Sequence, residues 1–257
     1  MHRAVEMSPG VPGAGRFFEE TMLQPSDFFD LSDQFVAALF DECEYVWEAV
    51  GRIQWHVARL TRERQTIRGE VMSGAVVSNR AVHIADGARI EPGAYVLGPA
   101  YIGPGCVVRH GALVRENVIM FSGSVLGHAS EAKNSLFLPR AHAPHFNYVG
   151  DSILGHRVNL GAGSKLSNLT IVSEKDEMGR RPTVQVEVEG DVYDTGLAKL
   201  GAILGDDAQT GCNAVLNPGC LVGARTLIYA NLSLRKGYYG PDRVVKLRQT
   251  IEETTRR

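Results

Sequence analysis

Large aliphatic residues recur at every sixth position along most of this chain. The series runs from residue 84 to 138, continues from 148 to 166, and returns from 204 to 234. Small residues, mostly alanine, follow four positions after the large ones, and glycine or proline recurs between them. Neither an α-helix nor an alternating strand has a period of six, whereas a β-solenoid of short strands and corners does. The pattern therefore predicts a triangular solenoid in which three six-residue units make one coil and the large residues stack inside.

Two stretches interrupt this period. The first, 139–147, is a short polar loop that contains His142 and His145. Loops held by a rigid scaffold often carry catalytic groups, so this loop is the first candidate for an active site. The second, 172–199, is charged in its first half and alternates valines in its second half before a turn at residues 189–191. It predicts an inserted β-hairpin arm, which we expect to contact another subunit.

The residues before the solenoid have helical spacing instead. Apolar residues between 32 and 50 predict one amphipathic helix, with Asp30 or Ser32 as its N-cap and Gly51 at its end. A second, more polar helix is expected to reach about Arg68. Prolines and glycines near the N-terminus predict a flexible leader, and the basic C-terminal segment predicts a short helix that caps the solenoid. The expected order is a leader over 1–24, a helical extension over 25–70, the solenoid over 71–238 with its arm at 172–199, and a basic helix over 239–257.

Composition and charge narrow the class of protein. The chain has 257 residues, of which 44% are hydrophobic and 22% charged, and its formal net charge is -2. These values are ordinary for a globular protein and give no reason to expect a nucleic-acid partner. No apolar run approaches the roughly 18–20 residues of a membrane span, and the N-terminus lacks the apolar segment of a secretory signal. We therefore expect a cytoplasmic protein without a membrane partner.

The cysteines and histidines do not suggest a metal centre. The four cysteines show no CxxC pairing, and Cys106 and Cys220 fall at small interior positions of the period, so both are expected to be core residues. No two histidines lie five residues apart, which is the spacing that a carbonic-anhydrase-like metal site on such a solenoid needs. A metal-dependent lyase is therefore disfavoured, and no metal site is expected.

A longer motif within the period is more specific than the repeat itself. It reads H-x-x-Y-x-G-D…N-x-G-A-G and runs from His145 to Gly163. The motif and its surroundings, over most of residues 84–235, resemble the acetyltransferase half of the bifunctional glucosamine-1-phosphate N-acetyltransferase/N-acetylglucosamine-1-phosphate uridyltransferases, and above all their stand-alone or archaeal-type relatives. The resemblance implies a left-handed parallel β-helix that forms a homotrimer, with active sites at the subunit junctions. It also implies acetyl-CoA as co-substrate, an amino-sugar phosphate as acceptor, and a place in UDP-N-acetylglucosamine biosynthesis.

The resemblance implies roles for individual positions as well. His145 matches the general base, and Glu131 matches the carboxylate that orients it. The positions that match the sugar-phosphate pocket are Arg115, Lys133, Tyr148 and Asn159. The positions that match the acetyl-CoA site are Ala162, Asn168, Cys212 and Ala230.

The chemistry of these residue types agrees with the implied reaction. An amine loses a proton as it attacks a thioester, and histidine, with an ordinary pKa of about 6.5, is suited to accept that proton. The backbone N–H groups of residues 161–163 could stabilise the oxyanion that forms. Arg115 and Lys133 are cations within a repeat of apolar and small residues, and cations suit an anionic substrate. His142 is expected to be a bystander.

Several departures from the family leave alternatives open. Nothing in residues 1–70 resembles a glycine-rich nucleotide-binding motif, so nucleotidyl transfer by this chain alone is not expected. Leu169 replaces a tyrosine of the bacterial enzymes, and Cys212 replaces a serine. One alternative is a non-catalytic solenoid that binds a sugar phosphate, and another is a member of the nucleotidyltransferase family that acts with a separate uridyltransferase partner. Acyl transfer to a sugar hydroxyl or to a nucleotide-linked sugar also remains open.

Overall fold

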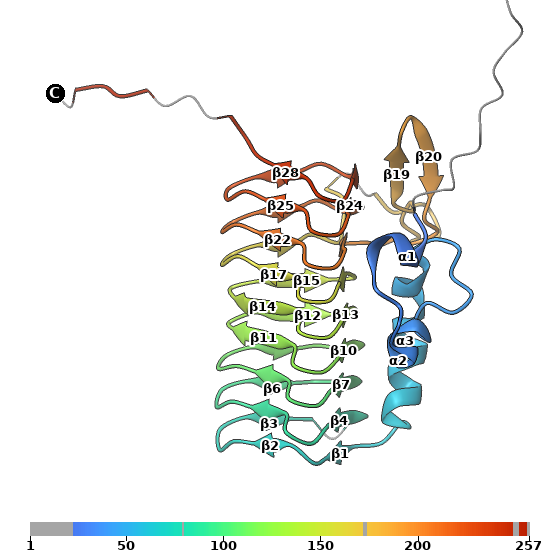
Figure 1. Cartoon of the computed structure of the whole chain (residues 1–257). Helices are drawn as coiled ribbons and strands as arrows, with labels where there is room; N and C mark the ends of the chain where they lie inside the picture. The colour runs from blue at the N-terminus through green and yellow to red at the C-terminus, as the bar shows by residue number, and fades with distance from the viewer. Residues whose placement is uncertain (1–22, 79, 172–173, 249–251, 256–257) are drawn as a thin grey trace, which may run out of the picture.

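Parallel strands stacked into a three-sided column form the body of the molecule (Figure 1). The computed structural model describes residues 23–78, 80–171, 174–248 and 252–255. Three sheets, here called A, B and C, form the sides of the column, and the chain passes through them in that order in each coil. Neighbouring strands within each sheet pair in parallel. The predicted mainly-β solenoid is therefore confirmed.

The strands are short and evenly distributed among the three sides. Sheet A contains β1 (Thr66–Ile67), β4 (Val82–Ile84), β7 (Ala100–Ile102), β10 (Val118–Met120), β13 (Ser135–Phe137), β16 (Ile153–Leu154), β21 (Ala202–Leu204), β24 (Cys220–Val222) and β27 (Gly237–Tyr239). Sheet B contains β2 (Glu70–Val71), β5 (Arg89–Ile90), β8 (Val107–Val108), β11 (Val125–His128), β14 (His142–His145), β17 (Asn159–Leu160), β22 (Gln209–Thr210), β25 (Leu227–Ile228) and β28 (Val244–Val245). Sheet C contains β3 (Val76–Val77), β6 (Tyr95–Val96), β9 (Leu113–Val114), β12 (Glu131–Lys133), β15 (Tyr148–Gly150), β18 (Lys165–Leu166), β23 (Val215–Leu216) and β26 (Ser233–Leu234).

The interior of the column is a stack of apolar side chains. In sheet A, Ile84, Ile102 and Met120 lie in register on successive strands, and all three are fully buried. Smaller residues, such as Ala100 and Cys106, are buried in the same core. Fully burying a large aliphatic side chain stabilises a fold by about 1.5–3 kcal/mol. Each coil therefore adds its own layer to one continuous core.

The phase of the repeat changes earlier than the sequence pattern indicates. Phe137, not the expected Leu138, lies in register with Met120 and points into the core. The corner that precedes Phe137 is one residue shorter than its predecessor, and Asn134 turns the chain there with a left-handed backbone (φ 44°). Ala143 and Val149 follow Phe137 at the regular six-residue spacing, so the expected Tyr148 faces outward, and a second short corner then returns Leu154 to its expected interior position. Residues 139–147 are therefore a regular corner and the strand β14, not an interruption.

Three helices cover the outer face of sheet A (Figure 1). They are α1 (Pro25–Phe28), α2 (Gln34–Ala37) and α3 (Glu48–Thr61). Outward-facing side chains of sheet A, including Leu136, Leu138 and Ile153, pack with Trp47 and Ile53 in a second buried cluster. Because both faces of sheet A are buried, its strands are apolar on both sides. This explains why the six-residue pattern did not distinguish Leu138 from Phe137.

The helix boundaries differ from those predicted. The single helix expected over 32–50 is replaced by the one-turn α2 and by α3, which continues through Gly51. Asp33, not Asp30 or Ser32, caps α2 by accepting hydrogen bonds from the amides that follow it. Glu42 has a left-handed backbone (φ 61°), which a continuous helix cannot accommodate.

The two ends of the solenoid also differ from the predicted boundaries. The solenoid begins at Thr66, where the second helix was expected to continue. At the other end, Val244 and Val245 form β28, which pairs with β25, and the described residues of the segment 239–257 contain no helix. Two adjacent β-branched residues at the right register complete sheet B more readily than they form a helix. The predicted leader lies almost entirely outside the described residues.

The inserted arm forms the predicted hairpin. Its strands, β19 (Gln185–Val188) and β20 (Asp191–Asp194), pair in antiparallel register. Val186 is fully buried in the cluster outside sheet A, and the ring of Tyr193 lies 5.7 Å from that of Tyr45. The arm therefore packs against the helical extension of its own chain, and its contact with another subunit stays a prediction.

A buried carboxylate joins the extension to the solenoid. Asp206 accepts hydrogen bonds from the backbone amide of Asp30 at 2.7 Å and from that of His156 at 2.8 Å. The His156 ring nitrogen Nε2 lies 3.1 Å from the Asp30 carbonyl oxygen, which closes the contact from the other side. Burial raises the pKa of Asp206, since desolvation disfavours its charged form.

We expect Asp206→Ala to lower the free energy of unfolding by about 1–3 kcal/mol, because it removes the acceptor of the buried His156 amide and of the partly buried Asp30 amide. The neighbouring Asp207→Ala is the matched control. Asp207 pairs with Arg157 at the surface, where a salt bridge contributes about 0–1 kcal/mol. Urea unfolding of both variants measures the difference, and equal losses would show that the buried contact adds nothing.

Candidate active site

The outer face of sheet C carries a cluster of charged side chains on successive coils. Arg115 follows β9, Glu131 and Lys133 lie on β12, and Tyr148 lies opposite Glu131 on β15. Arg115 donates a hydrogen bond from Nη1 to Glu131 Oε1 at 3.0 Å. This ion pair and hydrogen bond raise the pKa of Arg115 further above its usual value. The structure thus brings together three of the four predicted sugar-phosphate residues.

Two carboxylates that sequence reasoning did not single out complete this cluster. Lys133 Nζ lies 3.8 Å from Asp151 Oδ2 and 4.0 Å from Glu116 Oε1. Glu116 also lies 3.5 Å from Arg115 Nη2. Each cation is therefore already held between carboxylates, and an incoming anion would replace some of these contacts.

Asp151 lies at the centre of a group of hydrogen bonds within the cluster. It is 5% exposed and accepts hydrogen bonds from the side-chain amides of Asn134, at 2.9 Å, and Asn168. The Tyr148 hydroxyl in turn donates a hydrogen bond to Asn168 Oδ1 at 3.4 Å. Burial raises the pKa of Tyr148, which keeps its hydroxyl a hydrogen-bond donor. Asn168, which was predicted at the acetyl-CoA site, thus belongs to the sheet C cluster. The sequence signal for Asp151 was limited to its place as the acid of the Gly-Asp pair in the motif.

A second set of residues lies along the corner between sheets B and C. His128, His145, Ala162, Cys212 and Ala230 occupy the same position in successive coils, and we call them the corner column. In each coil the amide of the following residue donates to the column carbonyl below it, as Gly163 does to His145 at 2.9 Å. The corresponding bonds from Phe146 to His128, Asn213 to Ala162 and Asn231 to Cys212 are 2.9, 2.8 and 2.9 Å long. The predicted base and three of the four predicted acetyl-CoA positions therefore share one edge of the molecule.

The His145 side chain is exposed at the end of β14. Its backbone is fixed by Asn147, a buried residue that accepts from the His145 amide at 2.9 Å and donates to Gly161 O at 2.8 Å. Within the described residues, the His145 imidazole makes no hydrogen bond. Glu131, expected to orient it, pairs with Arg115 instead. The role of Asn147 was not predicted from the sequence, because the pattern placed this residue at the end of a polar loop and gave no sign of its burial.

The amides expected to stabilise an oxyanion are mostly engaged. Gly161 donates to Thr210 O at 2.8 Å, and Gly163 donates to His145 O. Of the three amides in this turn, that of Ala162 makes no hydrogen bond to any described residue. The turn can therefore offer one N–H group, fewer than expected.

The remaining candidates lie elsewhere. Asn159 lies on β17 in sheet B, opposite His142, and is not part of the sheet C cluster. Burial raises the pKa of both Cys106 and Cys220 to about 12, which agrees with their assignment to the core. Among the residues that the structure describes, no group of three or more metal-ligating side chains comes together. The described helices include none that is both long and apolar enough to cross a membrane.

Comparison with known proteins agrees with the hexapeptide repeat of this chain. The family model for the bacterial transferase hexapeptide (six repeats) matches residues 81–116. A bifunctional sugar-1-phosphate nucleotidylyltransferase/acetyltransferase of Sulfurisphaera tokodaii is 31% identical over 183 residues, which cover 71% of this chain and 43% of that protein. The bifunctional protein GlmU of Methanococcus vannielii is 32% identical over 137 residues, which cover 53% of this chain and 30% of that protein. The chain thus spans less than half the length of these relatives.

Solved structures show a more distant likeness. A UDP-N-acetylglucosamine acyltransferase from Campylobacter jejuni aligns with 66% of this chain and 69% of its own at 14% identity and a TM-score of 0.28. The acetyltransferase domain of PglB from Neisseria gonorrhoeae aligns with 77% of this chain and 70% of its own at 12% identity and a TM-score of 0.29.

Proposed function

We propose that this chain, whose hexapeptide repeat resembles the C-terminal part of bifunctional sugar-phosphate enzymes, is an acyl-CoA-dependent acyltransferase acting on a sugar derivative. The finer proposal is transfer of an acetyl group from acetyl-CoA to the amine of an amino-sugar phosphate such as glucosamine-1-phosphate. The observation that carries it is the corner column, which sets an exposed histidine in line with Ala162, Cys212 and Ala230 at the edge next to the charged cluster of sheet C.

In the proposed reaction the sugar amine attacks the thioester carbonyl, and His145 Nε2 or Nδ1 accepts its proton. The new C–N bond forms as the C–S bond of the thioester breaks. The protonated imidazole then returns its proton to the departing thiolate of CoA, so that the histidine ends unchanged. An exposed imidazole at the end of a fixed strand is free to meet a substrate in this way.

The sheet C cluster supplies the proposed acceptor pocket. Arg115 and Lys133 would bind the phosphate, and their present carboxylate partners keep both cations in place until the phosphate arrives. The phenol of Tyr148 adds a neutral donor. Asn159 on sheet B would serve this pocket only from another subunit, which accords with the proposal of a homotrimer with sites at the subunit junctions. A cytoplasmic location remains part of the proposal.

One observation favours a second candidate function. Glu131 is held by Arg115, and no hydrogen bond connects it with His145. A solenoid that binds a sugar phosphate without acetyl transfer would need only the sheet C cluster. Turnover with acetyl-CoA distinguishes the two functions. An acceptor panel that includes hydroxyl sugars and nucleotide-linked sugars then distinguishes amine from hydroxyl transfer.

We expect Lys133→Ala to raise the KM for glucosamine-1-phosphate about tenfold or more, since a lost charged hydrogen bond is worth about 1.5–3 kcal/mol. The KM for acetyl-CoA is expected to change little. Steady-state kinetics with each substrate varied in turn measures both values.

The control for this variant is Lys236→Ala, an exposed lysine near the C-terminal end of the solenoid. A second comparison uses glucosamine without its phosphate, for which the variant and the unmodified protein are expected to differ little. Equal losses with both acceptors would remove Lys133 from phosphate recognition.

A further inference from the structure

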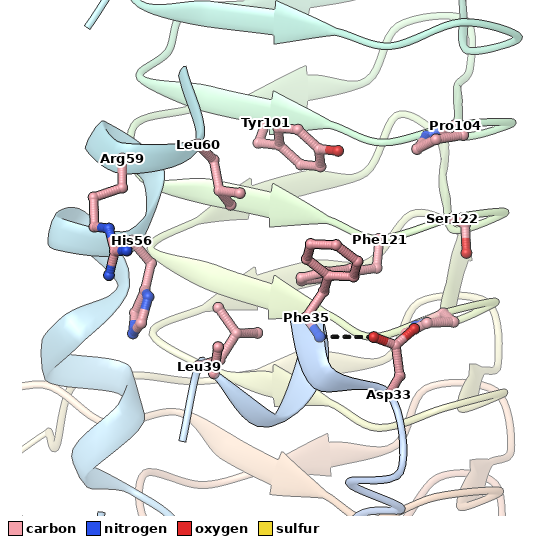
Figure 2. Close-up of a pocket in the computed structure, with 12 residues that line it drawn as sticks. Asp33, Phe35, Leu39, His56, Arg59, Leu60, Tyr101, Pro104, Phe121 and Ser122 are labelled. Carbon is pink, nitrogen blue, oxygen red and sulfur yellow. Dashed lines mark hydrogen bonds between the residues drawn. The ribbon is translucent and has the colours of Figure 1, made fainter. Parts of the chain in front are cut away.

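A cavity of about 460 Å³ lies between the helical extension and the outer face of sheet A (Figure 2). Three aromatic side chains form its walls: Phe35 from α2, Tyr101 from β7, and Phe121, which follows β10. Helix α3 contributes His56, Arg59 and Leu60 from another side. Sheet A is the side of the prism opposite the corner between sheets B and C. This cavity is therefore separate from the proposed acyl-transfer site.

One wall of the cavity is exposed in a way that packing does not explain. Phe35 is 69% exposed, although it lies within the amphipathic extension. Cavities of about 300–1,000 Å³ with mostly apolar walls and a few polar groups are typical of small-molecule sites, and they often lie between structural units. The size, the aromatic walls and the position of this cavity all match that description.

A smaller pocket of about 180 Å³ adjoins the cavity and is strongly cationic. Arg62, Arg64 and Arg68 line it, and no acidic residue does. The two pockets are neighbours, since Leu60 lines both and the ring of His83 in the smaller pocket stacks on Tyr101 in the larger one with centroids 5.0 Å apart.

These arginines are poorly neutralised by the protein. The side chains of Arg62 and Arg64 make no ion pair within the described part of the chain, and Arg68 has a single exposed partner, Asp86, at 3.8 Å. Arginine binds phosphate oxygens through paired N–H groups, and unpaired arginines beside a formed pocket are typical of phosphate recognition. The smaller pocket therefore has the charge and donors of a phosphate subsite.

We propose that the two adjoining pockets form one binding site for a nucleotide. The base stacks among Phe35, Tyr101 and Phe121, and the phosphates lie on the arginines of the smaller pocket. A flat apolar wall next to a cationic subsite complements a ligand that is aromatic at one end and polyanionic at the other. A free phosphate would use the smaller pocket alone, and an apolar ligand without charge would use the larger one alone.

Calorimetric titration of the full-length protein with ADP and UDP tests the proposal, with pyrophosphate as the probe that lacks a base. At least one nucleotide is expected to bind, and at least tenfold more tightly than pyrophosphate. Two variants at exposed positions, Phe35→Ala and the double change Arg62→Ala with Arg64→Ala, are each expected to weaken its binding at least tenfold. The double change Arg235→Ala with Lys236→Ala, at the other end of the solenoid, is expected to leave it unchanged.

Three results would overturn the proposal. One is the absence of ADP and UDP binding at millimolar concentration. Another is pyrophosphate binding as tight as that of the nucleotides, which would reduce the site to an anion pocket. The third is nucleotide binding that neither variant weakens, which would place the nucleotide elsewhere on the molecule. Circular dichroism of each variant confirms that the solenoid is folded before its titration is interpreted.

Discussion

Replacing His145 with alanine is expected to lower kcat/KM for acetyl transfer by about 10²–10⁴-fold, the usual contribution of a positioned general base. The residue lies on the edge that also carries Ala162 and Cys212, and its imidazole is exposed to substrate. The backbone of His145 is fixed by Asn147 and by the bond from Gly163, so the substitution removes a side chain without disturbing the corner. Thiol release from acetyl-CoA measures the rate.

His142→Ala is the matched control for this variant. His142 lies on the same strand, half-buried, with Nε2 3.3 Å from the carbonyl oxygen of Gly123. Its replacement is expected to change the rate by less than about threefold, because it contacts neither the corner column nor the sheet C cluster. Comparable losses in the two variants would mean that the strand, and not the His145 imidazole, is what activity requires.

Gly127→Ala is expected to destabilise the protein by about 3 kcal/mol, near the upper end of the cost of overpacking a core. A Cβ at this position would lie 1.7 Å from the carbonyl oxygen of Pro144, which is backbone and cannot rotate away. Strand β11 therefore depends on glycine to approach β14, the strand that ends at His145. Any relief of the clash shifts β14, so we expect activity to fall together with stability.

The control for that variant is Gly240→Ala. Gly240 has no left-handed backbone, and a Cβ there would meet only side-chain atoms at 3.8 and 4.0 Å. Alanine at position 240 is expected to change the free energy of unfolding of the protein by less than about 0.5 kcal/mol. Guanidinium unfolding and thiol release on both variants give the comparison. A stable and active Gly127→Ala protein would show that β11 and β14 can separate without consequence for the site.

The sequence predicted the solenoid because burial repeats at each coil. A residue that is buried in one layer has a counterpart in the next, as Ile84 and Ile102 do, so the period is visible without any alignment. The local phase was harder to predict. Leu136, Phe137 and Leu138 are all apolar and all buried, since the helical extension covers the outer face of sheet A. A pattern of apolar residues cannot show which of the two buried faces each residue occupies.

Part of the candidate site could likewise be predicted from the sequence, and part could not. His145, Ala162 and Cys212 were within reach of sequence reasoning through the resemblance to a known family, and the structure places them in one column although the arm separates Ala162 from Cys212 in the sequence. The partners within the sheet C cluster were not, because the choice of Arg115 as the partner of Glu131 depends on side-chain rotamers and on competing carboxylates. Asp151 was detectable only as the acid of the Gly-Asp pair in the motif, since its burial and its partners depend on the shape of a shortened corner.

We propose above all that this solenoid transfers an acetyl group. The measurement that tests it most directly is thiol release from acetyl-CoA by the unmodified protein in the presence of glucosamine-1-phosphate, with the product identified by mass spectrometry. We expect one thiol to be released for each N-acetylated sugar phosphate formed. The claim would be contradicted if neither thiol nor acetylated product appeared with glucosamine-1-phosphate or with any other amino-sugar or hydroxyl acceptor.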